Sequence, residues 1–198
     1  MRVLARPDRG LVAPALAHEL RAVSGAVISA KFGDCFYVKE AVAPWGIKVT
    51  PATPLAVGAK VDVTGSLQGA GSERSIDTSG GSVSLTDAGP FALNPAVLTN
   101  ASLGGAALNA LTPGVTSGMG PNTIGAYVSV CGRASYVDSA TFIVFDGSGP
   151  EVTVTCPNGS APADGAYVAA EGISSFGPGM TRGMQVWDSS CVVTLVGP

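Results

Sequence analysis

The chain has little charge and almost no histidine. Charged side chains make up 13% of its 198 residues, against about 25% in average soluble domains. The single histidine is His18, close to the N-terminus, so a Ser–His–Asp or Cys–His site would have no base elsewhere in the chain. Gly69-Ala70-Gly71 lacks the Lys-Ser/Thr continuation of a phosphate-binding loop. We therefore expect no enzymatic activity and no cofactor.

Other patterns are also missing. No run of 18 apolar residues is present, so we expect no membrane span. No C-x-x-C spacing occurs, and with one histidine a zinc site is not expected. Residues 1–9 lack the apolar core of a signal peptide. An extracellular or cell-surface location, which we expect on other grounds given below, therefore implies a leader that was removed or lies upstream.

The main positive feature is a pattern that occurs twice. Gly25 and Gly65 flank the first copy and are 40 residues apart, and Gly132 and Gly172 flank the second copy with the same separation. Each copy contains short segments in which apolar and polar residues alternate, which is typical of β-strands. Matched glycine spacing indicates one supersecondary plan used twice.

Each copy reads as about five short strands with a hairpin near its start, which resembles the OB-fold, a five-stranded Greek-key barrel. The predicted fold is therefore all-β, with two tandem five-stranded OB-like barrels joined by an ordered Gly/Ala/Pro-rich linker. The predicted boundaries are an N-terminal arm over residues 1–21, barrel 1 over 22–88, the linker over 89–124 and barrel 2 over 125–198. The linker carries apolar residues that we expect to pack on the barrels, namely Leu98, Leu103, Leu108 and Leu111.

Four cysteines are present, namely Cys35, Cys131, Cys156 and Cys191. An even count in a β protein suits an oxidising compartment, and four cysteines allow three pairings. Cys156 and Cys191 both fall at predicted strand positions of barrel 2, where a disulfide would stabilise the barrel by about 2–4 kcal/mol. The alternative is that the cysteines are buried free thiols, which behave as small hydrophobic side chains.

The N-terminal arm is apolar, and its expected contact residues are Leu4, Leu11, Val12, Leu16 and Leu20. It is predicted to be either a short helix from Pro14 or an extended segment. Because so apolar a segment is expected to be covered, we expect residues 1–20 to contact another subunit or the other barrel.

Charge is distributed unevenly along the chain. Residues 1–80 have a net charge of +2 and include all four lysines, whereas residues 125–198 have a net charge of −4. One explanation is drift on a solvated surface. The other is that a mildly basic end meets the acidic end of the next molecule.

Several motifs resemble tandem OB-like regions of large secreted bacterial proteins, most of which are uncharacterised. In barrel 1 the motifs are Gly33-Asp34-Cys35-Phe36-Tyr37-Val38 and Gly46-Ile47-Lys48-Val49; in the linker and barrel 2 they are Pro121-Asn122-Thr123-Ile124-Gly125-Ala126-Tyr127-Val128, Gly132-Arg133, Tyr136-Val137-Asp138 and Asp146-Gly147-Ser148-Gly149. The resemblance implies the fold, secretion and a non-catalytic role, and it implies no catalytic residues. The chain departs from this pattern in two places. At residues 41–45 the secreted proteins tend to be more polar and to carry an arginine, which this chain lacks there. The three cysteines of barrel 2 are the second departure.

These features lead to two functional hypotheses. The first is a structural module that associates head to tail with copies of itself, through the arm and the barrel edges, into a filament or surface layer. The second is an OB-type binding module for single-stranded nucleic acid or oligosaccharide. Its expected ligand face comprises Tyr37, Trp45, Lys39, Lys48 and Lys60. Alternatively, Phe36 fills the core while Tyr37 and the lysines simply face solvent. An isoelectric point near 5.0 argues against nucleic acid and leaves carbohydrate open.

Overall fold

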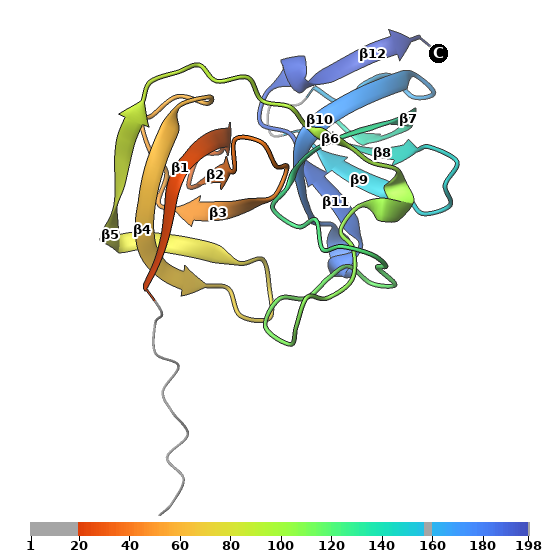
Figure 1. The fold of residues 1–198 in the computed structure, drawn as a ribbon. Helices are drawn as coiled ribbons and strands as arrows, with labels where there is room; N and C mark the ends of the chain where they lie inside the picture. The colour runs from red at the N-terminus through yellow and green to blue at the C-terminus, as the bar shows by residue number, and fades with distance from the viewer. Residues whose placement is uncertain (1–19, 157–159, 198) are drawn as a thin grey trace, which may run out of the picture.

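The computed structural model describes residues 20–156 and 160–197, without the side chain of Leu20, and consists almost entirely of β-strands. Two barrels lie side by side, and the linker, green in Figure 1, runs between them and along the second. The predicted all-β fold with two tandem barrels is confirmed.

Barrel 1 is a closed barrel of five strands in the order β1-β2-β3-β5-β4. Its strands are β1 (Leu20–Lys31), β2 (Phe36–Lys39), β3 (Gly46–Thr50), β4 (Lys60–Gln68) and β5 (Ser75–Asp87). Only β3 and β5 pair in parallel, and the other neighbours are antiparallel. Alternation along β4 turns Val61 and Val63 inward, where they join Phe36 and Ile76 in the core.

Barrel 2 repeats this strand order. Its strands are β7 (Tyr127–Asp138), β8 (Thr141–Phe145), β9 (Val152–Thr155), β10 (Tyr167–Phe176) and β11 (Arg182–Gln185). The pairing of β10 with β7 closes the ring, and β9 and β11 are parallel, like β3 and β5 in barrel 1. Two short strands extend this sheet, because β6 (Ala96–Val97) pairs with β7 and β12 (Val192–Val196) pairs with β10.

The glycines that close the two sequence copies have the same structural role. Gly65 lies in β4 and Gly172 in β10. A Cβ atom at Gly65 would clash with the carbonyl oxygen of Asp77, and one at Gly172 would lie 2.5 Å from the carbonyl oxygen of Gln185. Both positions therefore need glycine because the backbone of the last barrel strand passes directly over them.

The linker is ordered and packs on both barrels. Leu103 is fully buried in the core of barrel 2, where Leu98 also packs, and Phe91 lies against barrel 1 with its ring centroid 3.9 Å from Lys60 Nζ. Leu108 and Leu111 are exposed, so these two predicted anchors are wrong. They lie in a turn of the linker that is closed by an isolated antiparallel bridge between residues 109 and 112.

Candidate functional site

A buried cluster joins the two barrels, and we call it the joint. Its buried members are Ala30, Cys35 and Tyr37 of barrel 1 with Tyr127 and Ile173 of barrel 2, and Phe32, Leu93 and Trp187 pack around them. The Tyr127 backbone N–H donates a 3.0 Å hydrogen bond to the carbonyl oxygen of Pro44. A Cβ atom at Gly46 would lie 2.6 Å from the Gly125 carbonyl oxygen, so the two backbones touch directly. The barrels therefore share one continuous buried contact.

Tyr37 was predicted to face a ligand, and this prediction is wrong. Its ring is completely buried in the joint and makes an edge contact with Phe32, with the ring centroids 5.8 Å apart. Its hydroxyl donates a 2.8 Å hydrogen bond to Glu73 Oε1, and burial raises the pKa of the Tyr37 hydroxyl above its usual range. The outward face of β2 is thus covered by barrel 2 and is closed to a ligand.

The predicted lysines also do not form a ligand face. Lys39 is buried and donates its Nζ hydrogens to the carbonyl oxygens of Glu40 and Ala43, each at 3.0 Å; burial lowers the pKa of Lys39. Lys60 covers the ring of Phe91. Lys48 lies opposite Tyr37 on β3, where its charge acts on the buried cluster.

Trp45 alone keeps the exposure expected of a ligand contact, at 48%. Trp45 and Lys39 line one open hollow of about 200 Å³ together with Glu40, whereas Tyr37 lies in the joint and Lys60 at the linker contact.

Ionisation of Glu73, which is hydrogen-bonded to Tyr37 of the joint, makes the stability of the protein depend on pH. Burial raises the pKa of its carboxyl above the usual value, and the Tyr37 hydroxyl and the charge of Lys48 oppose that rise only partly. The folded protein therefore holds this proton more tightly than the unfolded chain does. The resulting stability is fully present below the unfolded-state pKa and is lost as pH rises through the folded-state pKa.

We expect Glu73→Gln to reduce the loss of stability that occurs as pH rises from about 4 to 7, because an amide cannot ionise. Its carbonyl can still accept the Tyr37 hydrogen bond. Urea unfolding at both pH values measures the change, and Glu151→Gln on the exposed surface is the matched control. Equal pH dependence in Glu73→Gln and the parent chain would contradict this role of Glu73.

All four cysteines are free thiols. Cys35 lies in the joint, Cys156 is buried in the core of barrel 2 and Cys191 packs against that core. Burial raises the pKa of the Cys35 and Cys156 thiols to about 11, and the charge of neighbouring Cys191 contributes at Cys156. The expected disulfide between Cys156 and Cys191 is therefore not formed. The alternative of buried free thiols describes Cys35 and Cys156, whereas Cys131 and Cys191 are half-buried free thiols.

The arm lies almost wholly outside the described residues, as do four of its predicted contact residues, Leu4, Leu11, Val12 and Leu16. Leu20, the fifth, begins β1 and pairs with Ser66 of β4. Barrel 1 therefore begins at Leu20 rather than at residue 22.

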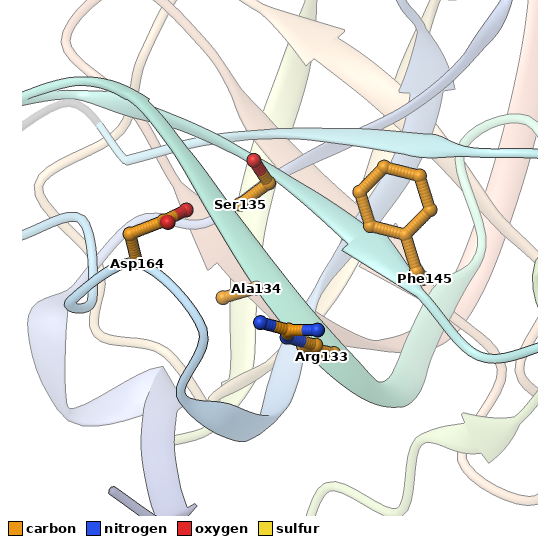
Figure 2. Close-up of a pocket in the computed structure, with 5 residues that line it drawn as sticks. All are labelled: Arg133, Ala134, Ser135, Phe145 and Asp164. Atoms are coloured by element: carbon orange, nitrogen blue, oxygen red, sulfur yellow. The ribbon is translucent and has the colours of Figure 1, made fainter. Parts of the chain in front are cut away.

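The sequence did not identify a polar pocket on the outer face of barrel 2, shown in Figure 2. It has a volume of about 300 Å³ and is lined by Arg133, Ala134 and Ser135 of β7, Phe145 of β8 and Asp164 from the loop before β10. In this view Ser135 lies between Asp164 and the Phe145 ring, and the Arg133 guanidinium lies below them. We call this hollow the Arg133 pocket.

Strand register explains why these side chains meet. Arg133 pairs with Phe145 on one side and with Tyr167 on the other, and directly paired residues project to the same face of a sheet. Phe145 and Tyr167 are 40% and 45% exposed. Asp164 is fixed by its Oδ1 atom, which accepts a 3.0 Å hydrogen bond from the Tyr136 N–H. Within the described ranges, no carboxylate lies within 4.0 Å of the Arg133 guanidinium.

A second surface feature is the outer edge of β12. Among the strands that the structure describes, β12 pairs only with β10. It has no charged residue, and Val193, Leu195 and Val196 are exposed. In barrel 1 the second half of β5 resembles it, because residues 82–87 pair only with β4. Each barrel therefore has a strand with one unpaired edge.

No three His, Cys, Asp or Glu side chains of residues 20–156 and 160–197 gather closely enough to hold a metal ion. The helical turns of these two ranges are all too short to cross a membrane. Comparison of the chain with protein-family models, with curated proteins and with solved structures finds no match.

Proposed function

We propose that the chain is a non-catalytic, extracellular structural module whose copies associate head to tail through the N-terminal arm and the barrel edges. The observation that carries this proposal is the β12 edge, which is apolar and uncharged and which no described strand pairs on its outer side. Soluble proteins usually protect such edges with lysine, proline, a bulge or a covering segment, because an open edge recruits another strand.

Residues 192–196 include no lysine and no proline, and a register shift interrupts the pairing of β12 with β10 between Thr194 and Val196. Val193 and Leu195 are each 53% exposed. A strand from a neighbouring molecule could bond to the free backbone groups of β12 while its side chains cover these two residues, as in β-strand addition.

The joint favours an assembly of defined geometry. Because Tyr37, Tyr127 and Ile173 are buried between the barrels, the free edges of barrel 1 and barrel 2 hold fixed positions on one unit. A head-to-tail contact between different surfaces of a rigid unit makes a filament when its rotation does not close. The joint also uses the face of barrel 1 on which an OB-type ligand site was expected.

The uneven distribution of charge along the chain also favours head-to-tail association. Residues 1–80 carry a net charge of +2 and residues 125–198 a net charge of −4. The basic end of one copy is then attracted to the acidic end of the next, which favours head-to-tail over head-to-head contact.

Deletion of residues 1–19 tests the role of the arm. It leaves β1 complete from Leu20, so we expect the barrels to fold and the assembly to separate into single chains. Light scattering gives the size, and circular dichroism checks that the strands remain. An assembly of unchanged size after deletion would show that the arm is not the contact.

The second candidate function, an OB-type binding module, is supported by the Arg133 pocket and by the hollow that Trp45 and Lys39 line. Nucleic acid has weaker support than carbohydrate, because Lys39 and Lys60 of the expected face are engaged within the protein.

A further inference from the structure

We propose that the Arg133 pocket binds a single acidic sugar, a uronic acid unit within an otherwise neutral oligosaccharide. The pocket combines a cation, an aromatic ring, a hydroxyl and a carboxylate around a hollow of about 300 Å³. That volume is at the lower end of the range for small-molecule sites and suits one sugar ring. This proposal does not rest on the proposed assembly, although Tyr167 beside the pocket also pairs with Val196 of β12.

Arg133 supplies the charge that recognises the sugar carboxylate. It lies on β7 between two paired strands, and no carboxylate of the described ranges forms an ion pair with it. A guanidinium presents its N–H groups as a planar fork that matches a carboxylate with two parallel hydrogen bonds. The ligand is thus expected to carry one carboxylate at this point.

The aromatic rings beside Arg133 supply a flat surface. Phe145 lines the pocket, and Tyr167 is the register neighbour of Arg133 on the other side. Both rings remain substantially exposed. The face of an aromatic ring is partially negative, so it attracts the C–H groups of a sugar ring, whose carbons are polarised by their oxygens.

Asp164 and Ser135 supply hydrogen-bonding partners for sugar hydroxyls. Asp164 Oδ1 already accepts the Tyr136 N–H, which fixes the carboxylate and leaves Oδ2 to accept a proton from a ligand hydroxyl. The Ser135 hydroxyl can donate or accept. A carboxylate beside an arginine selects a ligand that has both an anionic group and hydroxyl donors.

Two other ligand classes fit less well. A polynucleotide would meet a barrel that has two arginines and six carboxylates in residues 125–198, which opposes phosphate binding. A peptide finds no free strand edge at Arg133, because β7 is paired there with β8 on one side and with β10 on the other. A hydroxyl-rich ligand with one charge suits side-chain recognition.

Calorimetric titration with two matched probes tests the proposal. The probes are xylotetraose carrying one glucuronic acid and plain xylotetraose. We expect the acidic probe to bind about tenfold or more tightly than the neutral one, because a charge-assisted pair contributes at least about 1.4 kcal/mol, which is a factor of about ten. Arg133→Gln should abolish that difference in affinity. Phe145→Thr should lower the affinity for both probes.

Lys31→Gln, which removes a positive charge on barrel 1, is the control and should leave both affinities unchanged. The proposal is overturned if neither probe binds, if both bind equally, if Arg133→Gln retains the preference or if a short oligothymidylate binds more tightly than the acidic probe. Repeating the titration on the chain without residues 1–19 separates the two proposals. Retained binding there supports a site independent of assembly, and lost binding contradicts it.

Discussion

Replacing Ile173 with aspartate is expected to lower the free energy of unfolding of the chain by about 4 kcal/mol, because it buries a carboxylate without a partner. Ile173 has no exposed surface and lies in the joint beside Tyr37 and Tyr127. Urea unfolding measures the effect. Tryptophan fluorescence and circular dichroism should report one shared transition in the parent chain, since Trp187 packs against the joint and Trp45 lies in barrel 1.

The control for this prediction is Val137→Asp, which makes the same kind of change in the same barrel at a side chain that is 51% exposed. It should alter the free energy of unfolding by no more than about 0.5 kcal/mol. Similar losses in Ile173→Asp and Val137→Asp would mean that the joint does not contribute as the structure indicates.

The double substitution Val193→Lys and Leu195→Lys is expected to convert assemblies into single chains. Both side chains project from β12, the unpaired edge strand, and inward or edge lysines are the device that soluble β proteins use against edge-to-edge pairing. Light scattering should show a many-fold fall in mass with the circular dichroism spectrum unchanged.

Val137→Lys combined with Met119→Lys is the matched control for the β12 variant. It adds the same charge at two exposed apolar positions that lie away from β12. Its assemblies should keep the parent size, and a comparable fall in mass would assign the effect to net charge rather than to the edge.

The fold could be predicted because its signals are local and occur twice. Alternation along Lys60-Val61-Asp62-Val63 marks one buried face of a strand, and the repeated spacing to Gly65 and Gly172 marks where the last barrel strand crosses. Such patterns depend on strand geometry within one barrel. They therefore persist whatever the barrel packs against.

The candidate ligand face failed because packing between barrels leaves no local pattern. Alternation correctly places Tyr37 opposite to the core residues Phe36 and Val38. The outward side of β2 is nevertheless covered by Tyr127 and Ile173, which lie 90 and 136 residues after Tyr37 in the sequence. Alternation along one strand therefore cannot predict which outward face of barrel 1 will be covered by barrel 2.

The Arg133 pocket was missed for a related reason. Tyr167, Arg133 and Phe145 become neighbours only through the registers of three strands. A shift of one residue in either register would move a whole strand's side chains to the other face. Alternation could identify Arg133 as outward, but it could not say that an aromatic ring would lie on each side.

The most direct test of the proposed assembly is the molar mass of the intact chain as a function of concentration, with and without reductant, by multi-angle light scattering. The proposal predicts a mass that rises well above the 19.6 kDa of a single chain as concentration increases. Because all four cysteines are free thiols, the rise should be the same in reductant. A mass that stays at that of one chain across the whole concentration range would contradict the proposal.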